Sequence, residues 1–541
     1  IGHDLGPAYG REYGPLEVKE TATNTVRELA GWKESTVVDP EAIEWNISRV
    51  NADDVWGIGI NGTGAVVGDL DSGVQWDHPA LINQYRPQIA GAPTRHDYNW
   101  FDGLTGSATP VDYDGHGTHT MGTIAGDDGG SNQIGMAPGA KWIACAGIGS
   151  PYVDPFGCFE FFMAPTKLDG SDPRPDLAPH VISNSWSSAG TDFHGAIQAL
   201  RAAGIFFSKS AGNTGPACST ITNPGQWPEV TAAAAFSISD TIASFSSRGP
   251  IYMDYEAIMK PDLAAPGVNV RSSYPDNTYV QMSGTSMACP HVTGAVALLI
   301  SANPELAGQI DILQMLLKKS AQPMIDGQCL PFVDHPNDVW GWGILNVQDA
   351  VQAALEVDLG GIAGTVYDSV TSDPIADVHI TYTNTDLAWP FSDLSGNDGS
   401  FGATLVAGNY DLSAALYGYV PGSVSGVEVE DGAVTEQDIY LEPAGIYTVS
   451  GVVTETGTDD PLLATIEFVG SPVTVTTDPA TGAYSAEIAE GTYWMVVTSA
   501  GHARQEVQVT VSSDLTLNYS LEPIDNYYMR GAECQPVFKW M

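Results

Sequence analysis

Residues 65–73 read Ala-Val-Val-Gly-Asp-Leu-Asp-Ser-Gly, an apolar run that ends in a carboxylate and a turn. Such a run predicts a buried β-strand whose last residue, Asp71, lies at the edge of a sheet. Similar apolar runs recur along the chain and alternate with stretches of helical character. The expected strands are 65–70, 141–144, 181–184 and 205–208, and the expected helical stretches are 121–124, 193–203 and 292–301. Strands that alternate with helices predict an α/β domain with a parallel sheet.

The pattern changes near residue 357. After residue 360 helical periodicity disappears, and short strands with a period of two follow one another. Several motifs occur twice at offsets of 80 to 87 residues; for example, Leu-Glu-Pro at 441–443 returns at 521–523. Two tandem units of this kind predict two small all-β sandwich domains. The expected organisation is an N-terminal extension (1–43), an α/β domain (44–357), two β-sandwich repeats (360–443 and 446–523) and a tail (524–541).

The charge of the chain excludes some classes of partner. The 541 residues include 65 Asp and Glu but only 20 Lys and Arg, which gives a net charge of -45. Nucleic acid and anionic membrane surfaces require a cationic face, so neither is expected as a partner. No apolar run reaches the length of about 18 residues typical of a membrane-spanning helix, so no transmembrane segment is expected.

Six cysteines are scattered along the chain without a Cys-x-x-Cys pair. This distribution argues against a zinc knuckle, a thioredoxin-like site and a disulfide-built scaffold. The sequence leaves two alternatives open: one or two disulfides, or cysteines that are all free thiols. Cys289 is expected to be a small buried hydrophobic residue rather than a nucleophile.

Three local motifs contain the residue types of nucleophilic catalysis. They are Asp-Ser-Gly at 71–73, His-Gly-Thr-His at 116–119 and Gly-Thr-Ser-Met-Ala-Cys-Pro-His at 284–291. A hydroxyl is a weak nucleophile until a histidine removes its proton, and a buried carboxylate holds that histidine in the required tautomer. Asp71, His116 and Ser286 are therefore the candidates for carboxylate, base and nucleophile.

The local setting of Ser286 supports its role. It stands where a long apolar helix begins, and the positive end of a helix favours a developing oxyanion. Pro290 is expected in the first turn of this helix, where its missing N–H has no partner to lose. His116 and His119 lack the intervening Glu of the zinc metalloprotease pattern, so neither is expected to bind a metal.

The three motifs resemble the signature motifs of the subtilisin-like serine proteases (subtilases), in that family's order Asp, His, Ser. The resemblance covers roughly residues 44–350 and includes the flanking segments 76–81 and 260–267. Segments at 44–46, 97–101, 137–145 and 183–187 are similar to the bacillopeptidase F branch. This resemblance implies a subtilisin-like parallel sheet flanked by helices, and a serine endopeptidase that cleaves peptide bonds through an acyl-enzyme.

The resemblance also implies roles for other residues. Asn213, in the loop 210–215, would donate to the oxyanion together with the Ser286 backbone N–H. The residues expected to bind substrate in the S1 pocket are Ser185, Trp186, Ser187, Ala211 and Gly212. Because Trp-Ser stands at 186–187 where many relatives have Leu-Gly, the size of the pocket stays open. A cis peptide bond at Pro224, at the edge of this pocket, is a further expectation.

No cofactor is expected for the chemistry, and protein or peptide substrates are the expected partners. The family commonly binds structural Ca²⁺, so calcium is expected, with the acidic loops 126–129 and 169–176 as candidates whose ligands the sequence does not assign. The expected location is extracellular, and attachment to the cell surface stays open. Residues 1–43 are either a propeptide remnant or an ordinary extension.

The C-terminal repeats resemble carboxypeptidase-regulatory-like domains, for which spacing, tethering and substrate positioning all stay open. Two other functions are conceivable for the whole chain. The repeats suggest an adhesion or scaffold protein with a catalytically silent subtilase domain, but the intact residues at 71, 116, 213 and 286 argue against it. A processing protease for selected partners would be favoured by an anionic S1 pocket, and the pocket-loop residues named above include no acid.

Overall fold

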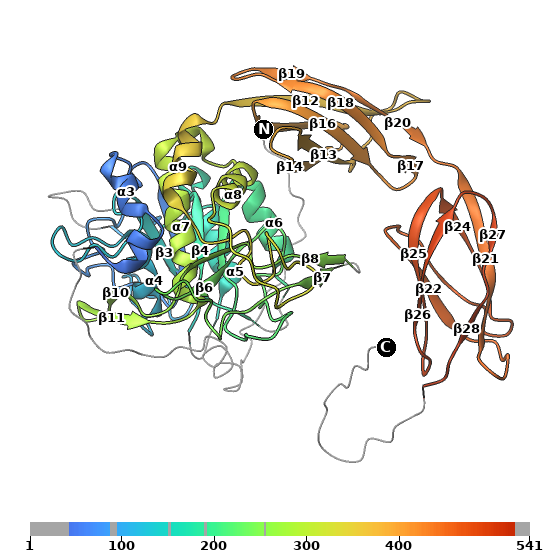
Figure 1. Cartoon of the computed structure of the whole chain (residues 1–541), viewed down its shortest axis with the longest axis horizontal. Helices are drawn as coiled ribbons and strands as arrows, with labels where there is room; N and C mark the ends of the chain where they lie inside the picture. Colours follow the sequence, from blue (N-terminus) through green and yellow to red (C-terminus); the bar gives the residue numbers. More distant parts are fainter. Residues whose placement is uncertain (1–42, 87–94, 150–152, 189–191, 254–255, 525–541) are drawn as a thin grey trace, which may run out of the picture. The chain divides into compact units, whose positions relative to one another are not determined.

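The computed structural model describes residues 43–86, 95–149, 153–188, 192–253 and 256–524. The chain divides into two compact units, Ile1–Val357 and Asp358–Met541 (Figure 1). The first unit combines helices with a parallel sheet, and the second is built from β-sheets whose pairs are mostly antiparallel. The predicted succession of an α/β region and an all-β region is confirmed. The predictions for the N-terminal extension and the tail fall, apart from Ile43 and Ile524, outside the described residues.

A seven-stranded sheet of order β2-β3-β1-β4-β5-β6-β9 forms the centre of the first unit. All neighbouring strands in it are parallel. The strands are β1 (Val66–Asp71), β2 (Trp100–Asp102), β3 (Lys141–Ala146), β4 (Val181–Asn184), β5 (Phe206–Ser210), β6 (Thr231–Phe236) and β9 (Leu263–Pro266). Strands β4, β5 and β6 are buried throughout, as expected for a parallel sheet covered on both faces. The four predicted strands are confirmed to within two residues at each end.

Helices cover both faces of this sheet (Figure 1). They are α2 (Trp45–Arg49), α3 (Ala52–Gly57), α4 (His116–Ala125), α5 (Pro155–Met163), α6 (His194–Ala202), α7 (Thr285–Ala302), α8 (Ile310–Lys319) and α9 (Val347–Glu356), with short 3₁₀ turns η1 (Pro175–Leu177) and η2 (Pro304–Leu306). Two hairpins pair β7 (Ile251–Met253) with β8 (Glu256–Ile258) and β10 (Val270–Tyr274) with β11 (Thr278–Met282). On β1, Asp69 contacts Thr120 of α4, whereas Gly68 lies against Phe162 of α5. Alternate residues of the strand therefore face different helices.

Helix α7 runs through the interior of the first unit. By length and composition alone it could cross a membrane, but 89% of it is buried inside the protein. A helix that is apolar all round is typical of a protein core. The opposite side of the sheet holds an aromatic cluster, which includes Phe159, Phe193, Phe207 and Trp186.

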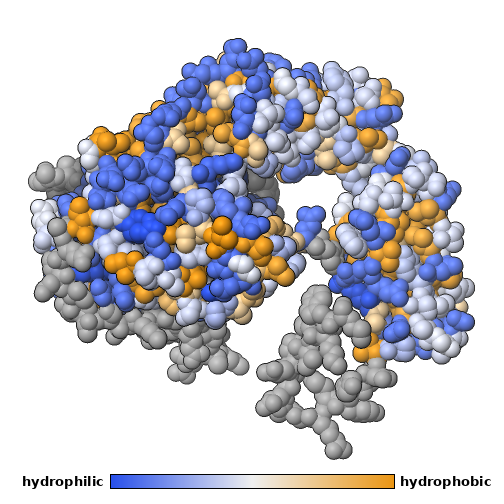
Figure 2. All heavy atoms as spheres, viewed as in Figure 1, coloured by the Kyte–Doolittle hydropathy of each residue, from blue (hydrophilic) through white to orange (hydrophobic). Residues whose placement is uncertain are grey.

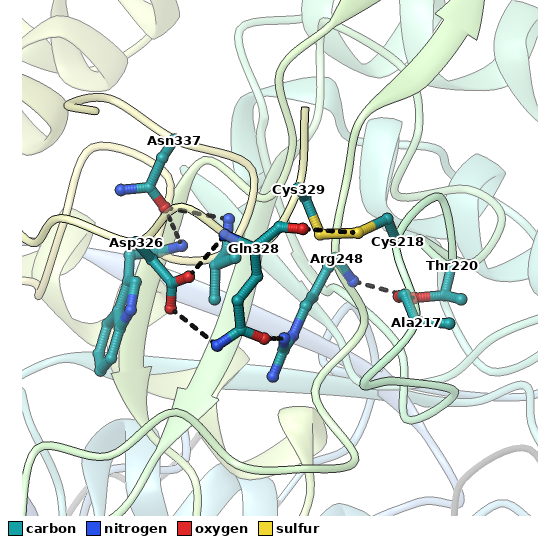
Figure 3. The surroundings of a disulfide bond; sticks show 10 residues. Ala217, Cys218, Thr220, Arg248, Asp326, Gln328, Cys329 and Asn337 are labelled. Atoms are coloured by element: carbon teal, nitrogen blue, oxygen red, sulfur yellow. Dashed lines mark hydrogen bonds between the residues drawn. A yellow bond between two sulfur atoms is a disulfide. The ribbon is translucent and has the colours of Figure 1, made fainter. Parts of the chain in front are cut away.

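Two disulfides join segments of the first unit. Cys145–Cys158 links β3 to α5, and Cys218–Cys329 links the loop after β5 to the segment before α9 (Figure 3). Beside the second disulfide, Gln328 accepts a hydrogen bond from Arg248. Cys289 is a buried free thiol, as predicted. Of the two alternatives that the sequence left open, the structure therefore has the disulfides, while Cys534 lies outside the described residues.

The second unit contains the same arrangement of strands twice. Its strands are β12 (Leu359–Asp368), β13 (His379–Asn384), β14 (Trp389–Leu394), β15 (Ser400–Val406), β16 (Gly408–Ala415), β17 (Tyr419–Val420), β18 (Gly422–Val429), β19 (Val434–Glu436), β20 (Ile439–Pro443), β21 (Ile446–Glu455), β22 (Ala464–Val469), β23 (Thr474–Thr476), β24 (Ala483–Ala489), β25 (Gly491–Ser499), β26 (Gln505–Val511), β27 (Leu515–Thr516) and β28 (Tyr519–Leu521). The sheet β14-β13-β16-β18 returns as β23-β22-β25-β26. Strand β12 pairs with β15, β19 and β20 as β21 pairs with β24, β27 and β28.

This repetition confirms the two β-sandwiches predicted from the repeated motifs. Burial alternates along strands such as β16 and β24, which is the pattern of a sheet with one face in the core and one face in solvent. Apolar residues are interspersed with polar ones on the face of the unit visible in Figure 2.

Candidate active site

The three candidate catalytic residues stand at the ends of secondary-structure elements. Asp71 is the last residue of β1, His116 is the first residue of α4, and Ser286 is the second residue of α7. Their exposed fractions are 2%, 1% and 2%, respectively. In open α/β sheets, the carboxyl ends of the strands are the usual place for a functional site.

Asp71 and His116 are in direct contact. His116 Nδ1 lies 2.7 Å from Asp71 Oδ1, which also accepts the backbone N–H of Ser72 at 2.7 Å. Burial disfavours the charged imidazole, but the charge and hydrogen bond of Asp71, together with the charges of Asp114 and Asp112, outweigh burial and raise the pKa of His116. The ring is thus held with Nδ1 toward the carboxylate, which leaves Nε2 for proton transfer.

A glycine allows α4 to approach the turn after β1. A Cβ on Gly117 would lie 2.0 Å from the Gly73 carbonyl oxygen, so no larger residue fits there without a shift of the backbone.

Asp112 also joins α4 to the turn after β1. It accepts hydrogen bonds from Ser72 Oγ at 2.8 Å and from the Thr118 backbone N–H at 2.7 Å. Asp112 was not among the site residues predicted from the sequence.

Ser286 and Ser185 form a reciprocal pair of hydrogen bonds. Ser286 Oγ donates to the Ser185 carbonyl oxygen, and Ser185 Oγ donates to the Ser286 carbonyl oxygen, both at 2.9 Å. The expectation for Pro290 was wrong: α7 begins at Thr285, so this proline lies in the second turn, inside the helix. Pro290 has no N–H for the Ser286 carbonyl four residues earlier, and the Ser185 hydroxyl supplies a donor instead.

The side-chain amide of Asn213 is oriented by Thr285. Asn213 Oδ1 accepts the backbone N–H and the hydroxyl of Thr285, each at 2.9 Å. With Oδ1 committed to these donors, the Asn213 NH₂ group points away from them and can donate elsewhere. Thr285 precedes Ser286 directly, so the same helix start orients the amide and carries the hydroxyl. Thr285 was not among the site residues predicted from the sequence.

Three of the five expected substrate-binding residues come together around Thr222. Ser187 Oγ lies 2.6 Å from Thr222 Oγ1, which donates to the Ala211 carbonyl oxygen at 3.3 Å. At Gly212, φ is +112°, and a Cβ there would lie 2.5 Å from Thr222 Oγ1. Ser185 contacts Ser286 as described above. The Asn223–Pro224 peptide bond is cis, as expected.

Trp186 does not join this group. Its side chain is 4% exposed and packs against Phe159 and Phe193 in the aromatic cluster, with ring centroids 6.4 and 5.3 Å away. Lys209, which the sequence did not single out, is buried nearby, with Nζ 6.0 Å from the Trp186 ring centroid. Its Nζ donates to Ser210 O and Oγ at 2.7 Å, and burial lowers the pKa of the amine to about 7.

The acidic loops that were candidates for calcium use their carboxylates within the protein. Asp128 Oδ1 accepts the backbone N–H groups of Gly130 and Asn132, and Asp169 Oδ1 accepts from Ser171. Within the described ranges, no group of three or more His, Cys, Asp or Glu side chains could hold a metal ion. Neither loop thus brings three such side chains together, and structural calcium stays a prediction without assigned ligands.

The two other motif histidines are buried and hydrogen-bonded. His119 Nε2 lies 3.1 Å from the Val270 carbonyl oxygen, and burial lowers the pKa of this ring to about 3. His291 Nδ1 lies 2.8 Å from the Met287 carbonyl oxygen. Both rings are thus committed to packing contacts.

Comparison with known proteins identifies the families that the chain resembles. The sequence model of the Subtilase family matches residues 62–343, and that of the carboxypeptidase regulatory-like domain matches residues 361–442. The chain is 41% identical to Bacillopeptidase F of Bacillus subtilis (strain 168) over 343 residues, which are 60% of this chain and 23% of that protein. It is 32% identical to Subtilisin BL of Lederbergia lenta over 267 residues, 49% of this chain and 86% of the relative. The match to Bacillopeptidase F thus spans less than a quarter of that protein's length.

Proposed function

The chain belongs to the subtilase family, and we propose that it is a secreted serine endopeptidase whose catalytic triad is Asp71, His116 and Ser286. The observation that carries the proposal is the hydrogen bond between His116 Nδ1 and Asp71 Oδ1. It gives the histidine the tautomer that a general base for a serine needs.

Each group has one step in the proposed reaction. His116 Nε2 takes the proton from Ser286 Oγ, which attacks the carbonyl carbon of a peptide bond. The amide of Asn213 and the backbone N–H of Ser286 donate to the oxyanion that forms. His116 then passes the proton to the leaving amine, and an acyl-enzyme remains on Ser286. Water activated by His116 releases the acyl group by the reverse sequence of steps.

Endopeptidase action has a direct test. A long unstructured peptide with an acetylated N-terminus and an amidated C-terminus offers no free end, so cleavage of it must be internal. Mass spectrometry of the products should show internal fragments with the wild-type enzyme and none with Ser286→Ala. Fragments from an unblocked peptide only, with the blocked one intact, would contradict an endopeptidase.

The acid side of the pH profile should report the contact between Asp71 and His116. Because His116 must be neutral to accept a proton and its pKa is raised above 6.5, kcat/KM should fall as the pH drops through this raised value. Asp71→Asn removes the charge that raises the pKa, so the fall should move to lower pH. The same substitution should reduce kcat by about 10⁴-fold, because it also allows the wrong tautomer. Hydrolysis of a peptide nitroanilide across the pH range measures both effects, and an unmoved profile would contradict the assignment of Asp71.

Secretion is supported by the two disulfides, since such bonds persist mainly in oxidising compartments.

The two disulfides also lead to a prediction for the stability of the first unit. Cys218–Cys329 closes a loop with a sequence separation of 111, against 13 for Cys145–Cys158. By the loss of entropy in the unfolded chain, the disulfide of the longer loop should stabilise the folded state by about 5 kcal/mol and that of the shorter loop by about 3 kcal/mol.

The pair Cys218→Ala/Cys329→Ala should therefore destabilise the first unit more than Cys145→Ala/Cys158→Ala. Both pairs can be compared by denaturant unfolding in a Ser286→Ala background, which prevents self-cleavage during the measurement. A larger loss from the shorter loop would contradict the entropic account.

The domain organisation completes the proposal. Residues 44–357 form the protease domain, and 360–443 and 446–523 form two regulatory-like repeats that act as a spacer or a tether. On the face drawn in Figure 2, apolar residues are mixed with polar ones, which supports a spacer. The silent-scaffold alternative loses support because the chain retains the full set of catalytic residue types.

A further inference from the structure

A second buried carboxyl group lies behind Asp71. Asp69 is 1% exposed and stands two residues earlier on β1, so both side chains project from the same face of the strand. Helix α4 presents His116 and Thr120, one turn apart, to this face. His116 contacts Asp71, and Thr120 Oγ1 lies 2.9 Å from Asp69 Oδ2. The strand and the helix are thus joined by two successive side-chain contacts, of which only the first takes part in the proposed chemistry.

The hydrogen bonds around Thr120 require a proton that an ionised Asp69 does not provide. Thr120 Oγ1 lies within hydrogen-bond distance of Asp69 Oδ2 and of the Gly117 carbonyl oxygen, at 2.9 and 3.0 Å. A hydroxyl has one proton, and both of these neighbours are acceptors while Asp69 is a carboxylate. If Asp69 is protonated on Oδ2, it donates to Thr120 Oγ1, which in turn donates to the Gly117 carbonyl. Both contacts are then hydrogen bonds.

The surroundings of Asp69 also favour the neutral acid. Asp69 forms no ion pair among the described residues, and its Oδ1 is buried without a hydrogen-bond partner there. Burial, followed by the charges of Asp71 and Asp112, raises the pKa of Asp69, and the nearby hydroxyls of Thr120 and Ser183 offset only part of this rise. An isolated buried carboxylate is costly, so the group takes up a proton instead.

Helices α4 and α7 both contact β1, and the further titratable groups on them do not compensate a charge on Asp69. On α4, burial lowers the pKa of His119 to about 3, which keeps that ring neutral. On α7, burial raises the pKa of the Cys289 thiol, which likewise stays neutral. His116 gains a positive charge during turnover, and Asp71, which is in direct contact with it, compensates that charge.

We propose that Asp69 is a positioning residue of the triad: a neutral carboxylic acid that donates to Thr120 Oγ1 and holds α4, and with it His116, against β1. The inference rests on the proposed function of His116, since positioning has a meaning only if this ring is the base. The contact needs a donor on Asp69 but no charge. This requirement separates the proposal from a purely electrostatic role.

Two substitutions of Asp69 test the need for a donor. Asp69→Asn keeps a donor for Thr120, whereas Asp69→Val suits a buried strand but has none. Asp69→Asn should retain most of the turnover. Asp69→Val should lower kcat by about 10- to 100-fold with little change in KM, the size of effect expected when a reacting group is displaced by up to about 1 Å. Thr120→Val should cause a similar loss, and the double variant Asp69→Val/Thr120→Val should be no worse than either single variant.

The protonation state has its own measurement. In a Ser286→Ala background at neutral pH, infrared difference spectra against Asp69→Asn should show loss of one protonated carboxylic acid C=O band. If Asp69 were ionised, Asp69→Asn would instead remove a carboxylate band. It would also shift the acid limb of kcat/KM to lower pH, because a negative charge on the same face of β1 as Asp71 would be lost. Either result, or equal losses from the Asn and Val variants, would overturn the proposal.

The infrared result does not depend on turnover, so it also separates the two claims. If Asp69 were protonated but Ser286→Ala kept wild-type activity, the proposed triad would be refuted, while the neutral state of Asp69 would stand. An ionised Asp69 in an enzyme that loses all activity with Ser286→Ala would refute only the positioning role.

Discussion

Ser286→Ala is expected to reduce kcat/KM on the order of a millionfold, the loss typical of removing the nucleophile from a Ser–His–Asp site. The hydroxyl forms the covalent intermediate, and alanine offers no replacement. The fold should survive, because the substitution removes the hydrogen bond from the Ser286 hydroxyl to the Ser185 carbonyl, while Ser185 can still donate to the carbonyl of residue 286. Nitroanilide hydrolysis and thermal unfolding of the same preparations measure the two outcomes.

Ser283→Ala provides a matched control. Ser283 lies three residues ahead of Ser286, and its hydroxyl accepts the backbone N–H of Asn269 at 2.8 Å, outside the proposed reaction. This variant should keep its activity to within a small factor. Activity of Ser286→Ala that a thiol reagent abolishes would indicate a cysteine nucleophile and rule out Ser286 in that role.

Asn213→Ala is expected to lower kcat by about 10²- to 10³-fold with a much smaller change in KM, because the lost donor acts on charge that develops in the transition state. The orientation of the amide supports this size of effect. Thr285 donates twice to Asn213 Oδ1, so the NH₂ group is held in place before the substrate arrives. Steady-state kinetics on one peptide substrate separates kcat from KM.

Thr285→Val is the graded companion to this variant. It removes the hydroxyl donor to Asn213 Oδ1 but keeps the backbone donor, so its loss should lie between those of the wild type and Asn213→Ala. A change confined to KM in Asn213→Ala would show that the amide binds substrate rather than the oxyanion.

The parallel sheet could be predicted because its strands are short apolar runs that end in polar turns. At β1 and β4 the sequence signal and the structural element agree to within a residue. The two sandwiches could be predicted because the chain repeats its own motifs. The start of α7 was harder to place. Pro290 suggested a position in the first turn of the helix. Inside the helix, a proline leaves the carbonyl of Ser286 without its usual N–H donor. The hydroxyl of Ser185, which follows β4, donates to this carbonyl instead.

The residues that the sequence analysis missed depend on contacts between distant segments. Thr222 follows β5 and contacts Ser187 and Ala211 only in the folded chain. No local sequence pattern indicates these contacts. Lysine is rarely buried, so Lys209 could be found only from the structure. Asp69 looks like a polar interruption of a strand until Thr120 of α4 is seen beside it.

The central claim is that Ser286 is an activated nucleophile, and intact mass after treatment with a fluorophosphonate tests it most directly. The reagent reacts with a serine hydroxyl only where a base and an oxyanion site assist the attack. One adduct is expected on the wild-type protein and none on Ser286→Ala. A well-folded wild-type protein without an adduct, or an adduct that persists in Ser286→Ala, would contradict it.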